Sequence, residues 1–190
     1  AVKVAGSDIK NWLETAAKRF NTIDPTQATV QKLVSTFPGY NFDMFTTPDL
    51  TYEIDVTQPV GSRIKNLMYK GVALDPAAQF IVATNNYRAS GGGNFPGLDG
   101  SKTIYASPDA NRDVLISYIK KIGSVKRATN GSQRSWRFTK LATSAATVVF
   151  PSAAGKLTAA GAAGINNVTL YQADDGTNKG LSLYQIDLTQ

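Results

Sequence analysis

A short apolar run that leads into a glycine-rich loop constrains this chain more than any other feature. Residues 80–84 are apolar and rich in β-branched side chains, which predicts a buried strand. Tyr87 follows, and then three consecutive glycines occupy positions 91 to 93. Glycine lets the backbone come close to a ligand, and successive N–H groups can form a concavity that binds anions. The pattern therefore predicts a binding loop at the end of a rigid strand.

The loop offers a ring and a charge to a flat anionic molecule. Tyr87 supplies the ring, and Arg88 supplies a fixed positive fork. The predicted binding residues are Tyr87, Arg88, Ala89, Ser90, Gly91, Gly92 and Gly93, with Asn86 and Asn94 as further candidates. The alternative is a glycine-rich surface turn with a partly buried tyrosine and no ligand.

The chain contains neither histidine nor cysteine. Histidine is the commonest general base at neutral pH and the commonest metal ligand. We therefore predict no catalytic residue and no metal ligand within this chain. Asp174, Asp175, Gly176 and Asn178 resemble a calcium loop, but their spacing fails the full pattern and favours a hairpin turn.

The net charge of +6 suits an anionic ligand. The basic residues are scattered along the chain, so we do not expect a nucleic-acid polymer as partner. No run of eighteen apolar residues is present, which argues against a membrane span. A length of 190 residues with 42% hydrophobic residues predicts one folded domain, or two small subdomains sharing a core.

Two helices stand out. Residues 7–20 begin with Ser7 as a cap, and their apolar face comprises Ile9, Trp12, Leu13, Ala16, Ala17 and Phe20. Residues 107–122 begin with Ser-Pro-Asp and end before Gly123. The second helix is expected to bury Val114, Leu115, Tyr118, Ile119 and Ile122. A loop over 21–38 has a short helix at 26–34 as one option, and the Ala/Gly-rich stretch 152–164 is either a small helix or a connection.

Alternating or short apolar runs predict the strands, at 2–4, 40–44, 50–57, 63–69, 79–84, 103–105, 135–138, 147–150, 168–171 and 181–188. Together with the helices they predict an α+β fold, in which one mixed or antiparallel sheet carries a few packed helices and the Tyr87 loop lies at its edge. Tyr105 is a second candidate ring near the loop, but its short apolar run favours packing.

The run Asn-Asn-Tyr-Arg-Ala-Ser-Gly-Gly-Gly at 85–93 resembles the substrate loop of the C-terminal domain of the 5′-nucleotidase family. Further pieces agree in order: Tyr-Asn-Phe-Asp at 40–43, Tyr-Glu-Ile-Asp-Val-Thr-Gln-Pro at 52–59 and Ser-Pro-Asp-Ala-Asn-Arg at 107–112. The resemblance spans nearly the whole chain. Within the family it is strongest to the bacterial bifunctional 2′,3′-cyclic-nucleotide 2′-phosphodiesterase/3′-nucleotidases.

The resemblance implies that residues 1–190 are the substrate-binding domain of a hydrolase. In the family, an N-terminal metallophosphoesterase domain holds two divalent metal ions and performs the chemistry. That domain is absent from this sequence, so we expect a fragment that is inactive by itself. The implied partners are a nucleotide substrate and the N-terminal domain, and the implied location is periplasmic or otherwise exported.

The resemblance also assigns roles within the loop. Tyr87 aligns with one of two rings that hold the nucleotide base, and the other ring lies in a Tyr-Pro-Asn type stretch upstream of the first strand. Many 5′-nucleotidases carry an aspartate at the position of Gly93 that binds the ribose hydroxyls. Its absence favours the cyclic phosphodiesterase over a 5′-nucleotidase or UDP-sugar hydrolase. A non-catalytic binding or interaction module is the remaining alternative.

Overall fold

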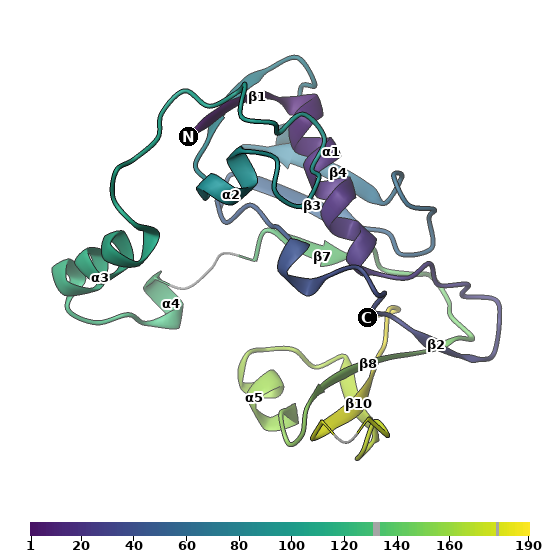
Figure 1. Cartoon of the computed structure of the whole chain (residues 1–190). Helices are drawn as coiled ribbons and strands as arrows, with labels where there is room; N and C mark the ends of the chain where they lie inside the picture. Colours follow the sequence, from purple (N-terminus) through teal and green to yellow (C-terminus); the bar gives the residue numbers. More distant parts are fainter. Residues whose placement is uncertain (131–133, 178) are drawn as a thin grey trace. The chain divides into compact units, whose positions relative to one another are not determined.

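The computed structural model describes residues 1–130, 134–177 and 179–190. The chain divides into two compact units. The first, unit 1, comprises Ala1–Ala16, Asp43–Tyr52 and Asn66–Trp136. The second, unit 2, comprises Ala17–Phe42, Glu53–Lys65 and Arg137–Gln190. Sheets and short helices occur in both, as predicted for an α+β chain (Figure 1).

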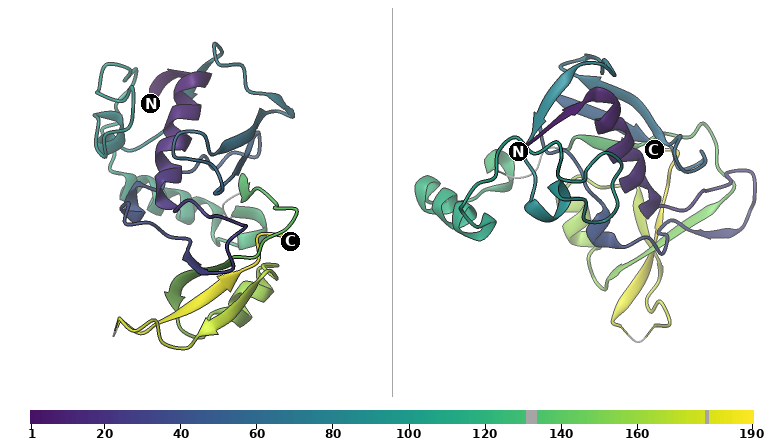
Figure 2. Two further views of the ribbon diagram at one scale, coloured as in Figure 1. Left: turned by 90° about the vertical axis from the view of Figure 1, so that its right-hand side faces the viewer. Right: turned by 45° about the horizontal axis from the view of Figure 1, so that its top comes forward.

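Unit 1 begins with a strand that runs directly into a helix. β1 (Val2–Ala5) pairs antiparallel with β6 (Gln79–Val82), and α1 (Gly6–Ala16) follows β1 (Figures 1 and 2). The predicted apolar face of α1 is buried, and the chain then continues as a 3-10 turn, η1 (Ala17–Arg19). The first residue of α1 has to be glycine, because a Cβ on Gly6 would lie 2.2 Å from the Asp75 carbonyl oxygen.

A four-stranded sheet has the order β5 (Val72–Ala73), β4 (Ile64–Tyr69), β3 (Leu50–Ile54), β7 (Trp136–Phe138). β3 buries Leu50, Tyr52 and Ile54 and leaves the residues between them more exposed, so its predicted alternation is confirmed. Lys70 and Gly71 both have positive φ, 51° and 80°, which allows the tight turn between β4 and β5.

Unit 2 contains a mixed sheet with the order β2 (Val30–Lys32), β8 (Thr147–Ala153), β10 (Leu181–Ile186), β9 (Val168–Gln172). β2 pairs with β8 in parallel, and the other pairs are antiparallel. α5 (Leu157–Ala162) connects β8 to β9 and lies beside β9 (Figure 2). The predicted strands of this region and the small-helix option are therefore confirmed.

The acidic stretch between β9 and β10 is the predicted hairpin turn. The Asp175 carboxylate accepts hydrogen bonds from Thr177 N (2.9 Å) and Thr177 Oγ1 (2.6 Å), which close the turn. Asn178, named with this stretch, lies outside the described residues. Among the residues that the structure describes, no group of three or more His, Cys, Asp or Glu side chains could hold a metal ion.

Several strand and helix predictions are wrong. Three separate sheets replace the single sheet expected, counted over the described ranges. The 26–34 stretch contains β2 instead of a helix, and residues 30–32 pair with β8. Residues 40–44 do not form a strand: η2 (Gly39–Asn41) is a 3-10 turn with Tyr40 exposed. β6 is not the buried strand expected: Gln79 and Ile81 are exposed, and Phe80 and Val82 are only partly buried.

The second predicted helix differs in its start and in its burial. α3 (Asn111–Ile122) begins at Asn111, since Ser107 Oγ accepts from Asp109 N (3.2 Å) and closes a turn ahead of the helix. Gly123, with φ of 76°, ends it as predicted. None of its residues is buried, so the expected packed face is wrong. In the described part of the chain, no helix is both long and apolar enough to cross a membrane.

Candidate functional site

The predicted binding loop begins with a one-turn helix in unit 1. α2 (Asn86–Ala89) is capped by Asn85, whose Oδ1 accepts from Arg88 N at 2.7 Å. Ser90 Oγ closes the other end by donating to Asn86 O at 2.8 Å. The glycine-rich pattern predicted a loop here, although the capping asparagine was a signal for a helix start. Tyr87 projects from α2 with 55% of its surface exposed.

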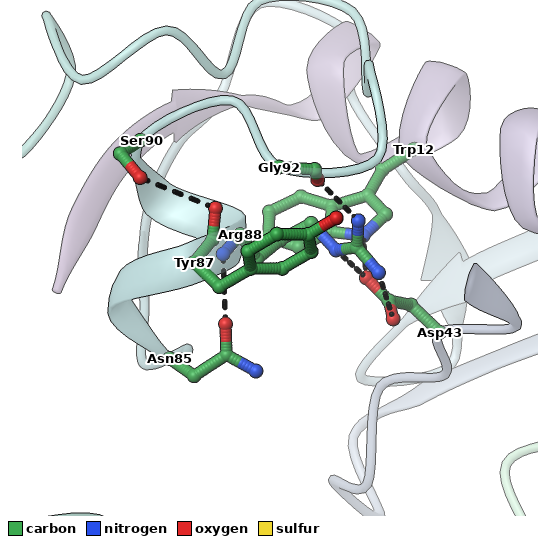
Figure 3. A network of polar contacts seen from close by, with 7 residues as sticks. All are labelled: Trp12, Asp43, Asn85, Tyr87, Arg88, Ser90 and Gly92. Carbon is green, nitrogen blue, oxygen red and sulfur yellow. Dashed lines mark hydrogen bonds and ion pairs between the residues drawn. The ribbon is translucent and has the colours of Figure 1, made fainter. Parts of the chain in front are cut away.

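Arg88, which was predicted to supply a fixed positive fork, points into unit 1. The residue is only 4% exposed, and its guanidinium forms a bidentate ion pair with Asp43 (Figure 3). Nε donates to Oδ2 at 2.6 Å and Nη2 donates to Oδ1 at 3.0 Å. Nη1 donates to Gly92 O, and the guanidinium lies 3.9 Å from the centroid of the Phe95 ring. These contacts occupy the guanidinium inside the unit.

Asp43 joins α2 to α1. Besides the Arg88 ion pair, its Oδ2 accepts a hydrogen bond from Trp12 Nε1 at 2.7 Å. Trp12 is buried on α1, where its ring packs on Phe45 (5.4 Å between centroids) and Phe95 (6.1 Å). The chain between Asp43 and Arg88 gave no sequence signal for their pairing.

The glycine loop does not present the predicted row of free amides. Ala89 N, Ser90 N, Gly91 N and Gly92 N donate to the carbonyls of residues 85 to 88, and Asn94 N donates to Gly91 O. Those five amides are engaged within the segment, because they close the turns that follow α2. The prediction of an anion-binding concavity at these amides is therefore wrong.

Gly92 has a steric role. A Cβ there would lie 2.5 Å from Tyr87 O and 2.6 Å from Cδ1 and Cε1 of the Tyr87 ring. Real Cβ contacts are essentially never this short, so any side chain at position 92 would displace the ring or the loop. The neighbours Gly91 and Gly93 have φ of 100° and 80°, which favours glycine at both positions.

A cavity of about 740 Å³ lies beside α2 within unit 1. Asn86, Ser90, Tyr105 and Asp109 contribute to its walls, whereas Tyr87 does not. Tyr105 is 60% exposed, and residues 103–105 form no strand: Thr103 makes an isolated bridge with Val2, and Ile104 N donates to Ala1 O. The expected strand and the expected packing of Tyr105 are therefore wrong, and the second candidate ring faces an open cavity.

One further ion pair ties the end of the loop segment to α1. Lys102 Nζ contacts Asp8 Oδ2 at 2.7 Å, and Ala5 N donates to the same oxygen at 2.8 Å. Burial by itself would raise the pKa of Asp8, but the hydrogen bonds from Lys102 and Ala5 hold that pKa below its usual value. Lys102 Nζ also lies 3.0 Å from where a Cβ of Gly97 would be.

The chain is similar to proteins of one family. The profile of the 5′-nucleotidase C-terminal domain matches residues 1–100. The 2′,3′-cyclic-nucleotide 2′-phosphodiesterase/3′-nucleotidase of Salmonella typhimurium is 36% identical over an alignment covering 100% of this chain and 31% of the relative. The enzyme of the same name from Yersinia enterocolitica is 41% identical, covering 74% of this chain and 23% of the relative.

Two further similarities extend the comparison. The trifunctional nucleotide phosphoesterase protein YfkN of Bacillus subtilis is 44% identical over 62% of this chain and 9% of its own length. A solved Staphylococcus aureus structure assigned as a 5′-nucleotidase superposes with a TM-score of 0.57 at 22% identity, covering 72% of this chain and 26% of that one. This chain thus spans less than a third of each relative. With its profile matched over more than half of the sequence, the chain belongs to the 5′-nucleotidase C-terminal domain family.

Proposed function

We propose that this chain is the nucleotide-recognition domain of a phosphoesterase that hydrolyses 2′,3′-cyclic nucleotides and 3′-nucleotides, and that Tyr87 stacks on the base. One observation carries the proposal. Tyr87 is 55% exposed, while the adjacent Arg88 is 4% exposed and ion-paired. An exposed aromatic ring on an anchored support is suited to stacking, which is worth about 1–3 kcal/mol per base.

The similarities support the substrate class. Relatives that align with 74% to 100% of this chain carry the name 2′,3′-cyclic-nucleotide 2′-phosphodiesterase/3′-nucleotidase. Stacking tolerates different bases because every base has a flat face, which suits an enzyme that accepts several nucleotides. Gly93 has no side chain to bind ribose hydroxyls, which favours this class over a 5′-nucleotidase.

We assign the hydrolysis to a part of the protein outside this sequence. The relatives are more than three times as long as the region they share with this chain. The described residues offer no cluster of metal-binding side chains, so no step of the hydrolysis is assigned to them. The proposal places two divalent metal ions in an N-terminal metallophosphoesterase domain and the whole enzyme in the periplasm or another exported location.

Within the loop the residues divide into two groups. Tyr87, Asn86 and Ser90 carry side chains on or beside α2 that can contact base and sugar, and Asn94 can do so from the far end of the loop. The remaining predicted residues shape the support for Tyr87: the Arg88 guanidinium is engaged by Asp43 and Gly92, and Ala89, Gly91, Gly92 and Gly93 have no polar side chain.

The affinity of this chain alone should be low. One base stack and a few hydrogen bonds at about 0.5–1.5 kcal/mol each must offset an association cost of about 4–15 kcal/mol. We expect millimolar dissociation constants and no turnover. Hydrolysis of a cyclic nucleotide by the purified chain would refute the assignment of the chemistry to another part of the protein.

The test is an NMR titration with adenosine 3′-monophosphate. We expect shifts confined to residues 85–94 that disappear in Tyr87→Ala. The matched control is Tyr40→Ala, because Tyr40 is also exposed, at 77%, but belongs to unit 2. Shifts that persist in Tyr87→Ala, or equal losses in both variants, would contradict the proposed stacking role.

A further inference from the structure

We propose that Asp43 and Arg88 are positioning residues for Tyr87, and that their ion pair holds the ring in the orientation that receives the base. The inference rests on the proposed function and deepens it, since it names the residues that determine how the stacking surface is presented. Neither residue needs to touch the nucleotide. Both act through the backbone of α2 and the loop that follows it.

The Asp43–Arg88 ion pair restricts the orientation of α2. The Arg88 guanidinium is removed from water and uses Nε, Nη1 and Nη2 in contacts with Asp43 and Gly92. A buried guanidinium that lost these partners would retain the cost of desolvation without compensation. Bidentate pairs are also specific in geometry, because both N–H groups must align with the carboxylate. Few orientations of Arg88 therefore satisfy the pair.

The pair is itself held by the core of unit 1. Trp12 Nε1 donates to the same Asp43 oxygen that accepts from Arg88 Nε. The ring of Phe95, which packs on Trp12, lies against the guanidinium. The hydrogen bond from Trp12 fixes Asp43 relative to α1, and the ion pair with Arg88 fixes α2 relative to Asp43.

Arg88 then determines the surroundings of the Tyr87 ring. A helix of four residues has no independent stability in water, so α2 depends on contacts beyond itself. The bond from Arg88 Nη1 to Gly92 O draws the glycine loop against the Tyr87 ring (Figure 3). The guanidinium lies 5.8 Å from the centroid of that ring. The loop supports the ring, and 55% of the residue stays exposed for a ligand.

The test compares Arg88→Met and Asp43→Asn with a matched control. Asp43→Asn keeps the size of the side chain and an oxygen that can accept from Trp12. It therefore provides a folded variant for the test if Arg88→Met does not fold. The control is Arg137→Met, which removes another guanidinium–carboxylate pair, with Glu53 at 2.6 Å, from unit 2. Arg88→Lys tests geometry, because it keeps the charge but cannot form the bidentate pair.

Two readouts are taken below the melting temperature of each variant. The first, without ligand, is the ring-current shift of the Gly92 protons, which lie against the Tyr87 ring. The second is the Kd for adenosine 3′-monophosphate. We expect Arg88→Met, Asp43→Asn and Arg88→Lys to lose the Gly92 shift and to weaken binding toward the loss of a whole stack, about 5- to 150-fold. Arg137→Met should change neither.

The two readouts distinguish the positioning role from the proposed function. A folded Arg88→Met or Asp43→Asn protein that keeps the Gly92 ring-current shift overturns the positioning role, whatever its affinity. Equal loss of the shift in Arg137→Met also overturns it, because the effect would then be general. If the shift behaves as expected but Tyr87→Ala binds like the unchanged chain, the proposed stacking function fails while the positioning role stands.

Discussion

The two helices α2 and α3 of unit 1 differ in burial: the shorter helix, α2, contains a buried residue, and the longer helix, α3, contains none. α2 has four residues, and it carries Arg88, which is 4% exposed and paired with Asp43. α3 has twelve residues and buries none of them. Apart from Ile122, its large apolar side chains are 39% to 58% exposed: Val114, Leu115, Ile116, Tyr118 and Ile119.

The difference shows that helix formation and helix burial depend on different properties. Apolar spacing predicts which face of a helix is apolar, but not that another element covers that face. A one-turn helix has almost no stability of its own, so its presence depends on the contacts it makes. α3 follows from its own sequence, whereas the buried residue of α2, Arg88, pairs with Asp43, which lies 45 positions away.

The largest expected effect comes from breaking the ion pair of α2. Asp43→Ala would leave a buried guanidinium without its carboxylate and should lower the free energy of unfolding by about 3 kcal/mol. The counterpart on α3 is Asp113→Ala, which removes an exposed ion pair with Arg112. This variant should change the free energy of unfolding by less than about 0.5 kcal/mol. Urea unfolding measures both values, and similar losses would remove the distinction between the helices.

A smaller effect is expected from Gly92→Ala. The added Cβ would meet the backbone and ring of Tyr87, and overpacking of this kind costs about 1–3 kcal/mol. The variant should also weaken binding of adenosine 3′-monophosphate with the Asp43–Arg88 pair intact. Gly161→Ala is the control, because nothing lies within 4 Å of its Cβ position in α5. If Gly92→Ala behaves like this control, Gly92 does not support the ring.

Gly123→Ala, at the end of α3, tests the cost of a positive φ at a position where an added Cβ meets no other atom. No atom lies within 4 Å of its Cβ position, but its φ of 76° disfavours an L side chain by about 1–2 kcal/mol. We expect faster hydrogen exchange in the last turn of α3 and unchanged nucleotide binding. Weaker binding in this variant would show that α3 is coupled to α2.

Acid should weaken the anchoring of α1 through Asp8. Because its folded-state pKa is lowered, the carboxylate contributes stability above about pH 4, and this contribution is lost as the pH falls through the folded pKa. Asp8→Asn should therefore lower the melting temperature at pH 7, and the difference from the unchanged chain should shrink toward about pH 2. A difference that stays constant with pH would contradict this role.

The smallest effect is expected on the exposed face of α3. Leu115→Ser removes an apolar side chain that is 58% exposed, so the free energy of unfolding should change by less than about 0.5 kcal/mol. Thermal unfolding followed by circular dichroism measures the change. A loss above about 2 kcal/mol would indicate a covered core position and would contradict the comparison.

Local patterns predicted much of the fold correctly. The apolar face of α1 and the alternation of β3 are both buried as expected, since residues at helical or strand spacing share one face. The end of α3 at Gly123 was also predicted, because a positive φ depends mainly on the residue itself. The loop motif at 85–93 was enough to indicate the family, because its residue types and their order are specific.

The candidate site was only partly predictable. The sequence indicated Tyr87 as an available ring, and it is exposed. It could not indicate the direction of Arg88, because an arginine in a glycine-rich loop serves a ligand or a distant carboxylate equally well. The amides of residues 89–92 were misjudged for a similar reason, since the one-turn helix uses them.

The sequence by itself determined the elements with strong local periodicity, the turn glycines, the absence of histidine and cysteine, and the family. Only the tertiary structure decided that Asp43 neutralises Arg88, that Trp12 holds Asp43, and that the apolar face of α3 stays exposed. The physical reason is that backbone preferences act between near neighbours in the chain. Burial and charge pairing depend on which distant residues are brought into contact, and no local pattern records that.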